Sequence, residues 1–432
     1  MCEQLAVKGG STDDRRPTTP KKFQLALAKW GSAMKTTLLL LVGVSAISEQ
    51  QKRTVECSLN GFITMKKGQQ HNTTLQQCEC FQGWKGNTCN ELHLIPVNEK
   101  TKLLGYKEEM TSSWGGSIVQ EQGDKGTNKY HMFVSRFSNH CGLDAWQSNS
   151  EIIHATTDDI GNLPFRYEEV LFPVFSHNPL VTRSPGDGNW VIFFEMADPP
   201  PCGYSTCDCY NGTTTDECNE MNDFDCPLNL QNWPSYMSYS KSLNGPWSSP
   251  QMIPIFSKGG DFNLSPIINA DGSLYGLWRD GIGDPWVSHL RSFTAKHYLD
   301  VFSYRKNDTD IWPDLDVAAV EDPFLYRDSD DYYHAIFHDM QNECRHLGVA
   351  NGTGSCGGHG FSPDGGATWH YSSDPLTFDG FVQNEDGTND TYTRRERPHL
   401  VFDQENNILA LSTAVMFGDL DESFTHLQFV AN

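Results

Sequence analysis

The stretch that decides the fold lies at Val320-Glu321-Asp322-Pro323-Phe324-Leu325-Tyr326, and an acidic turn at 328–331 joins it to the aromatic run Tyr332–Phe337. Two short apolar and aromatic runs separated by a tight polar turn are the signal of an antiparallel β-hairpin. The first run begins with two carboxylates, where an inner strand should be apolar. This unit therefore predicts an inner strand with functional residues at its N-terminal end.

The same unit occurs four more times, at intervals of about 55 to 90 residues. Each copy has a short strand, a turn rich in Gly, Asp, Asn or Gln, and a second strand of apolar residues, and the copies cover 116–134, 177–194, 265–278 and 397–411. Radial repetition of such units closes sheets into a ring with few exposed edges. We expect an all-β fold, a five-bladed β-propeller over residues 100–432, with a two-sheet β-sandwich as the alternative.

The composition and charge of the chain exclude several other classes of protein. The 432 residues include 37 Gly, 22 Pro and 24 Phe, which argues against a coiled coil, a helical bundle or extended disorder. The formal charge is −23, and the first 48 residues are basic, so the remainder lies near −27. A body this acidic repels phosphate backbones and anionic lipid, so we expect no nucleic-acid or membrane-surface partner.

Residues 1–48 form an N-terminal extension and a signal peptide in our interpretation. The apolar run Thr36–Ser48 is too short to span about 30 Å of hydrocarbon, but it suits the apolar region of a signal peptide. Lys35 provides the positive flank, Met34 is the natural start, and cleavage is predicted after Ser48. We expect no membrane insertion after cleavage; an uncleaved anchor is the alternative.

Cysteines and glycosylation sequons indicate an oxidising compartment. Of the 13 cysteines, twelve follow Cys2, an even number that full pairing requires. Six Asn-x-Ser/Thr sequons point the same way, at Asn72, Asn211, Asn263, Asn307, Asn351 and Asn389. The sequence therefore predicts a secreted, extracellular glycoprotein with disulfide bonds.

A small cysteine-rich module occupies residues 53–92, which are too few to fold without crosslinks. The run from Cys78-Glu79-Cys80 through Gly83-Trp84 to Cys89 resembles the C-terminal half of an EGF-like domain. That resemblance implies the pairs Cys80–Cys89 and Cys57–Cys78. An EGF-like domain has six cysteines and this module has four, so the likeness is partial. Zinc is the alternative, but the run has no histidine at ligand spacing. A module of this kind is expected to act as a spacer or an adhesion surface.

The remaining cysteines lie in two loops. The stretch 198–233 interrupts the blade pattern and reads as a long crosslinked loop, with an odd number of cysteines at Cys202, Cys207, Cys209, Cys218 and Cys226. Cys141 would make that number even. In the fourth unit, Cys344 and Cys356 are predicted to form a disulfide with each other.

The polar starts of the five hairpins should meet in space. In a propeller the innermost strand of each blade lines the central channel, so the leading ends of these strands build one mouth of it. The residues concerned are Trp114 to Ser117, His177, Asn178, Asn263, Ser265, Glu321, Asp322, Arg397 and His399. A packed core has no use for such a polar set, so we predict the functional site at this mouth.

The blade pattern over about residues 100–432 resembles family 43 of the glycoside hydrolases and its five-bladed relatives. The best local match is Val320–Tyr326 followed by Tyr332-Tyr333-His334. The resemblance implies that Glu321 donates a proton to the leaving sugar oxygen. Such an acid needs a pKa held up near working pH by burial or by a neighbouring carboxylate, and Asp322 is one possible modulator.

Two family carboxylates are missing. The resemblance calls for an aspartate as general base at the start of blade one, where this chain has Gly115-Gly116-Ser117, and for another in blade three, where it has Asn263-Leu264-Ser265-Pro266. An inverting mechanism needs a base about 6.5 to 9.5 Å from the acid. Four carboxylates are candidates to replace it: Asp280, Asp284, Asp144 and Asp322.

The resemblance makes the chain a candidate glycoside hydrolase that cleaves a polysaccharide or oligosaccharide by single displacement, with a carbohydrate partner and no cofactor. The alternative is a non-catalytic carbohydrate-binding propeller with the EGF-like module as spacer. Catalytic candidates are Glu321, Asp322 and Asp280. The residues expected to bind substrate are Trp114, His177, Asn178, Arg279, His359, Arg397 and His399. The histidines show no local metal-ligand spacing, so no metal is expected.

Overall fold

The computed structural model describes residues 53–431, except 68–73, 123–127, 198–232, 255–262, 283–286, 316, 318, 341–355, 373–375 and 419–421. Contacts divide the chain into Met1–Glu49 and Gln50–Asn432, and everything below concerns the second unit. The predicted signal segment lies outside the described residues. No helix in the described part of the chain is long and apolar enough to cross a membrane.

Five four-stranded antiparallel sheets make up most of the structure, and they confirm the five-bladed β-propeller. The innermost strands are β6 (Ser113–Gln122), β10 (Ser176–Arg183), β14 (Ser265–Ile268), β18 (Val320–Arg327) and β24 (Arg394–Phe402). The second strands are β7 (Asn128–Phe137), β11 (Trp190–Met196), β15 (Leu274–Ile282), β19 (Tyr333–Asp339) and β25 (Ile408–Met416). The third strands are β8 (Ser150–Thr157), β12 (Ser235–Ser240), β16 (Val287–Ala295), β20 (Cys356–Ser362) and β26 (Ser423–Phe429).

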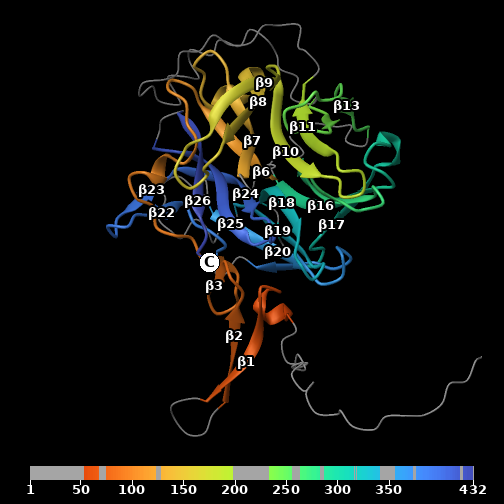
Figure 1. Ribbon diagram of the computed structural model, residues 1–432. Coiled ribbons are helices and arrows are strands. Elements are labelled where there is room, and N and C mark those ends of the chain that lie inside the picture. The colour runs from red at the N-terminus through yellow and green to blue at the C-terminus, as the bar shows by residue number, and fades with distance from the viewer. Residues whose placement is uncertain are drawn as a thin grey trace, which may run out of the picture. The chain divides into compact units, whose positions relative to one another are not determined.

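The outermost strands close the ring. Four of them follow in sequence order: β9 (Arg166–Phe172), β13 (Gln251–Met252), β17 (Arg305–Asp310) and β21 (His370–Ser372). The fifth blade instead takes its outer strand from the beginning of the propeller, because β5 (Gly105–Tyr106) pairs with β26. Neighbouring inner strands contact one another all the way around, and Figure 1 shows β6, β10, β18 and β24 gathered at the middle of the ring. Because the first strand of the propeller segment pairs with its last, no blade lacks its outer strand.

A few short elements lie before the blades, between them or in loops within them. The helical turns are η1 (Val55–Cys57), η2 (Thr101–Leu103), η3 (Leu143–Ala145), α1 (Trp146–Asn149) and η4 (Val301–Ser303). A two-stranded hairpin, β22 (Phe381–Gln383) with β23 (Asn389–Thr391), precedes the fifth blade.

The cysteine-rich module has the disulfides that the resemblance implied. Cys57 is bonded to Cys78 and Cys80 to Cys89. Its strands are β1 (Gly61–Lys67), β2 (Thr74–Cys80), β3 (Trp84–Lys85) and β4 (Glu91–Leu92), which pair as two small hairpins. Cys141 and Cys356 are also disulfide-bonded, to partners outside the described residues. Cys344 and the 202–226 cysteines lie outside them too, so those pairings stay predictions.

The module is joined to the propeller by a shared core. Cys57, Trp84 and Leu92 pack in one buried cluster with Ile336 and Leu411 of blades four and five. A backbone hydrogen bond adds to this contact, from Leu92 N–H to Thr377 O at 3.0 Å, and just after the module Ile95 N–H donates to Phe429 O at 2.8 Å. A freely hinged module would not bury apolar side chains against its neighbour, so this module is fixed to the propeller; its role as a spacer or an adhesion surface stays a prediction.

Blade one and blade four each contain a row of two buried histidines and a carboxylate. In blade four, Asp328 contacts His334 Nε2 at 3.1 Å, and His334 Nδ1 lies 3.0 Å from His359 Nε2. In blade one, Glu121, His131 and His154 repeat this arrangement at 3.2 and 2.8 Å. The blade-four row continues into the module, because His359 Nδ1 lies 2.8 Å from Asn90 Oδ1. Burial lowers the pKa of His359, which favours its neutral form.

Candidate functional site

Each blade contributes one residue with a left-handed backbone near the start of its inner strand. The φ angles are +68° at Gly115, +56° at Asn178, +45° at Asn263, +56° at Asp322 and +53° at Arg397. In four of the blades the pairing register shifts at this point, which is a β-bulge. A bulge breaks the alternation of a strand and re-aims a side chain. Here the bulges of blades two, four and five turn Asn178, Asp322 and Arg397 towards the channel mouth, and the bulge of blade one has a glycine. In blade three, Asn263 lies just before the inner strand.

These residues line one narrow cavity at the mouth of the channel. It has a free volume of about 360 Å³, including its opening to solvent. The lining comes from all five blades and includes Trp114, Gly115, Asn178, Asn263, Asp322, Arg397 and His399. Segments up to about 300 residues apart in the sequence therefore meet here, as the sequence predicted.

Glu321 lies beside this cavity between two cationic groups. Its Oε1 is 3.1 Å from Nδ1 of His338 on the neighbouring strand, and its Oε2 is 3.2 Å from a guanidinium nitrogen of Arg279. Burial alone would raise the pKa of Glu321, but Arg279 and His338 outweigh burial and hold it well below its usual range. The raised pKa that we expected for a general acid is therefore not found in the free protein.

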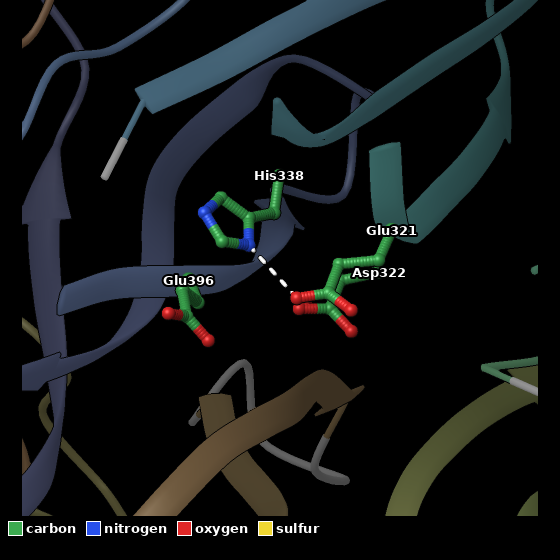
Figure 2. Close-up of side chains that lie close together, drawn as sticks. All are labelled: Glu321, Asp322, His338 and Glu396. Atoms are coloured by element: carbon green, nitrogen blue, oxygen red, sulfur yellow. Dashed lines mark hydrogen bonds and ion pairs between the residues drawn. The ribbon is translucent and has the colours of Figure 1, made fainter. Parts of the chain in front are cut away.

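The proton resides on His338 instead. Burial works against protonation of this imidazole, yet Glu396 and the hydrogen bond to Glu321 raise its pKa to about 9. Figure 2 shows the His338 ring directed at Glu321, with Glu396 and Asp322 around the same space. At neutral pH the Glu321–His338 pair holds one proton, and the imidazole carries it.

Two further carboxylates complete the cluster, and each has a cationic partner. Glu396 forms a bidentate pair with Arg394 at 2.6 and 2.9 Å. Asp322 Oδ1 lies 3.2 Å from Arg397 and also accepts a hydrogen bond from the side-chain amide of Asn263. Ligand atoms of Glu321, Asp322, His338 and Glu396 lie within 4.8 Å of one another, a spacing that a metal ion could use. Because these carboxylates already pair with guanidinium groups, charge balance requires no metal.

Blades two and three meet at a buried glutamate. Glu195, on β11, accepts a hydrogen bond from the backbone N–H of Asn263 at 2.7 Å and one from the side chain of Asn178 at 3.4 Å. It is 1% exposed. Asn178 and Asn263 are thus held in place by one carboxylate, which sets the polar wall of the cavity on this side.

The aromatic and histidine candidates at the mouth divide into two layers. Trp114 and His399 line the cavity, and the guanidinium of Arg394 lies 5.0 Å above the Trp114 ring. His177 is buried directly behind the bulge, where its Nδ1 contacts Ser150 Oγ at 2.7 Å and its ring packs at a tilt against Trp146, with 5.0 Å between the ring centroids. His177 therefore supports the wall rather than lining it.

Three other candidates require correction or lie out of reach. Asp280 pairs with Arg291 at 2.6 Å, and because adjacent strand residues face opposite sides, it points away from the cluster that Arg279 joins. His359 belongs to the buried row that contacts the module, not to the mouth. Asp284 lies outside the described residues. Asp322, the fourth candidate base, lies inside the cluster and pairs with Arg397. Glu396 and, to a smaller extent, Asp144 raise the pKa of the Arg394 guanidinium, so Asp144 is a candidate base that lies near the cluster without belonging to it.

The glycine in blade one has a steric cause. A Cβ on Gly115 would lie 2.8 Å from Cβ and 2.9 Å from Cδ of Arg397. Real Cβ atoms do not approach other carbons so closely. An aspartate does not fit at position 115 because the side chain of Arg397 occupies the space that its Cβ would need.

Sequence reasoning missed Glu195, His338 and Glu396. The Glu396-Arg397-Pro398 run has the same form as Glu321-Asp322-Pro323, and this match between blades was the available signal for Glu396. His338 faces Glu321 only through the strand register, in which the two residues are direct partners. Glu195 likewise depends on the register of β10 with β11, in which it is opposite His177.

Comparisons with known proteins add a likeness of fold. No family model matches the sequence, and neither does any curated protein. A family 43 glycoside hydrolase protein from Bacillus licheniformis is similar at 15% identity and a TM-score of 0.47, over 76% of this chain and 56% of that chain. This chain thus spans little more than half the length of that protein.

Two other similar structures are covered more fully. An endo-arabinase from Bacteroides thetaiotaomicron has 10% identity and a TM-score of 0.45, over 74% of this chain and 95% of that one. An α-L-arabinofuranosidase from Podospora anserina, solved with cellotriose, has 12% identity and a TM-score of 0.48, over 76% and 94%. All three similarities concern the propeller fold.

Proposed function

We propose that this chain is a secreted glycoside hydrolase whose reacting groups lie at the channel mouth. The observation that carries the proposal is the cluster of Glu321, Asp322, Glu396 and His338, with ligand atoms within 4.8 Å of one another beside a cavity lined by all five blades. Buried carboxylates cost free energy unless they are paired, and titratable groups gathered in this way beside a cavity are typical of functional sites.

Glu321 and His338 act together as the proton donor in this proposal. A general acid must be protonated when the glycosidic bond breaks. His338 holds that proton at neutral pH, 3.1 Å from Glu321. When the leaving sugar oxygen reaches Glu321 and expels water from the cavity, the proton moves from His338 Nδ1 to Glu321 and from Glu321 to the leaving oxygen.

The base in this proposal is Asp144. The 4.8 Å limit between the ligand atoms of Glu321 and Glu396 is shorter than the roughly 6.5 to 9.5 Å that leaves room for water in a single displacement. The proposal therefore does not assign the base to Glu396, which is paired with Arg394 and raises the pKa of His338. Asp144 comes from the loop that follows the second strand of blade one and lies near Arg394.

The charges around the mouth favour a neutral sugar as the ligand. Arg279, Arg394 and Arg397 are each matched by a carboxylate of the cluster. A strongly anionic ligand would have to displace these carboxylates from their partners, which costs more than binding an uncharged hydroxylated ring.

A second function is favoured by one specific observation. The backbone of blade one has Gly115 in place of a carboxylate, and Arg397 fills the space above it. This arrangement suits a propeller that binds a glycan without cleaving it. The two functions differ in whether sugar is released.

The experiment that separates them compares the wild-type chain with Glu321→Gln on two kinds of substrate. Natural glycans need a proton on the leaving oxygen, whereas an aryl glycoside with an acidic phenol leaving group does not. The hydrolase proposal expects Glu321→Gln to lose release from glycans while keeping much of its release from the aryl glycoside. Binding of the same glycans without release by the wild type would establish the second function.

A further inference from the structure

A second cavity lies where the cysteine-rich module meets the propeller. It has a free volume of about 790 Å³, including its opening to solvent. The module supplies Phe81, Gln82 and Trp84 to its wall, and blades four and five supply Tyr326, Phe402 and Asn406. Tyr326, Phe402 and Asn406 also line the wide opening at this end of the propeller channel, so the two spaces adjoin.

This cavity is at the other end of the inner strands from the carboxylate cluster. Tyr326 follows Glu321 by five residues along β18, which corresponds to roughly 16 Å at 3.3 Å per residue. The cavity is therefore separate from the proposed catalytic site, and none of its lining residues takes part in that chemistry.

Aromatic rings form its walls. Tyr326 and Phe402 lie 5.4 Å apart between ring centroids, and the Trp84 ring packs on His359 at 5.1 Å. The guanidinium of Arg53 lies 4.5 Å over the Phe81 ring. Rings held by such contacts present fixed faces, against which the C–H face of a sugar ring or another flat apolar surface can pack.

The hydroxyl of Tyr326 has no hydrogen-bond partner in the described part of the chain. The side chain is 8% exposed, and a buried hydroxyl without a partner is uncommon in folded proteins because it is costly. Burial, reinforced by the negative charge of Asp328, raises the pKa of this phenol well above its usual value. The group is thus a hydrogen-bond donor that lacks an acceptor.

The charged groups of the cavity are already matched. Arg53 pairs with Asp328 at 2.8 Å and with Asp330, and it also donates to Leu59 O at 3.1 Å and to Ser329 Oγ at 3.2 Å. The side-chain amides of Gln82 and Asn406 are exposed at the rim. Flat rings, rim amides and no unmatched charge are the chemistry that binds an uncharged, hydroxyl-rich ring.

We propose that the junction cavity is a second ligand site that binds a neutral saccharide ring. The ring packs against the aromatic wall of Trp84 and Phe402, accepts a hydrogen bond from the Tyr326 hydroxyl after a small shift of that side chain, and bonds to the rim amides. This explains why a crosslinked module is packed against the propeller, since neither part forms the wall alone. The proposal does not depend on hydrolysis at the channel mouth.

The test uses hydrogen–deuterium exchange and calorimetry on the whole chain carrying Glu321→Gln, so that no sugar is consumed. The probes are cellotriose, xylotriose and arabinotriose as free sugars, and the matching polysaccharides to distinguish a chain segment from a free oligosaccharide. We expect at least one probe to protect residues 81–84, 326–331 and 402–408 from exchange. Protection by a polysaccharide alone would identify a chain segment as the ligand.

Two variants locate the ligand. Tyr326→Phe removes only the unpartnered hydroxyl, so we expect about five- to tenfold weaker binding and a melting temperature that is unchanged or raised. Tyr332→Phe, on the same hairpin but not lining the cavity, is the matched control and should bind as before. The proposal is overturned if no probe protects these segments at millimolar concentration, or if the two variants bind a protecting probe equally well. Either result would leave sugar release by the wild type at the channel mouth unaffected. The proposed second site can therefore be rejected without rejecting the proposed hydrolysis.

Discussion

The side chain of Arg397 lies directly over the backbone of Gly115, with 2.8 Å between its Cβ and the position that a Cβ on Gly115 would take. Both residues have a left-handed backbone. From this place Arg397 reaches Asp322 at 3.2 Å. Blade one therefore has no side chain at Gly115, and the space above it holds Arg397 of blade five, which pairs with Asp322 of blade four.

Gly115→Asp tests this relationship. The new side chain would meet Arg397 and would also require φ near +68°, so we expect a loss of about 2 to 4 kcal/mol in the free energy of unfolding. Gly365→Asp is the matched control, because Gly365 has φ of +70° but nothing within 4 Å of its Cβ position. Urea unfolding measures both. Equal losses in the two variants would show that backbone strain alone acts at Gly115.

His338 should make stability depend on pH. Its pKa is raised to about 9 in the folded chain, because Glu396 and Glu321 outweigh burial, whereas an unfolded histidine titrates near 6.5. Its contribution is therefore complete below about pH 6.5 and is lost as the pH rises through about 9. Glu321 stays ionised across this range because its pKa is lowered.

The measurement is the free energy of unfolding of the wild type and of His338→Gln, from pH 6 to pH 10. We expect the wild type to lose roughly 1 to 3 kcal/mol more than the variant over this range. Parallel curves for the two proteins would contradict a protonated His338 in the folded state.

Asn90 should hold the module to blade four. Its Oδ1 accepts from Nδ1 of His359 at 2.8 Å in a fully buried position. Asn90→Ala leaves that imidazole nitrogen without its partner, so we expect a loss of about 1 to 3 kcal/mol and faster hydrogen exchange in residues 57–92. Asn162→Ala, whose side chain bonds only Asp159 at the surface in the described structure, should change neither. Unchanged exchange in Asn90→Ala would mean that the shared apolar core holds the module without this bond.

The sequence was sufficient for the propeller because the hairpin signal is local. The turn at 328–331 and its four counterparts mark each blade, and the polar strand starts predicted the convergence of Asn178, Asp322 and Arg397. The disulfides Cys57–Cys78 and Cys80–Cys89 followed from spacing that resembles a known module.

The partners within the site were beyond the sequence because they depend on register and on bulges. A shift of one residue in the strand register moves each side chain to the opposite face of the sheet. The register therefore determines that Arg279 pairs with Glu321 and that Asp280 pairs with Arg291. The same uncertainty hid His338, which is the direct partner of Glu321 on the adjacent strand. His359 was predicted to bind substrate, and the structure instead places it against Asn90. The sequence could not show this contact because the two residues are 269 positions apart.

The pKa direction of Glu321 also lay outside sequence reasoning. An adjacent carboxylate, Asp322, suggested a raised pKa, but Asp322 is turned towards Arg397 by the bulge, and Glu321 meets Arg279 and His338. Cations from two other strands therefore reverse the sign that the local sequence indicated.

The most direct test of the account is the release of reducing sugar from a panel of neutral polysaccharides by the wild type and by Glu321→Gln. We predict release by the wild type from at least one glycan and a loss of about 10²- to 10⁴-fold in the variant, with glycan affinity retained. Release that is equal in the two proteins would contradict the role of Glu321, and binding by the wild type without any release would contradict hydrolysis at this channel mouth.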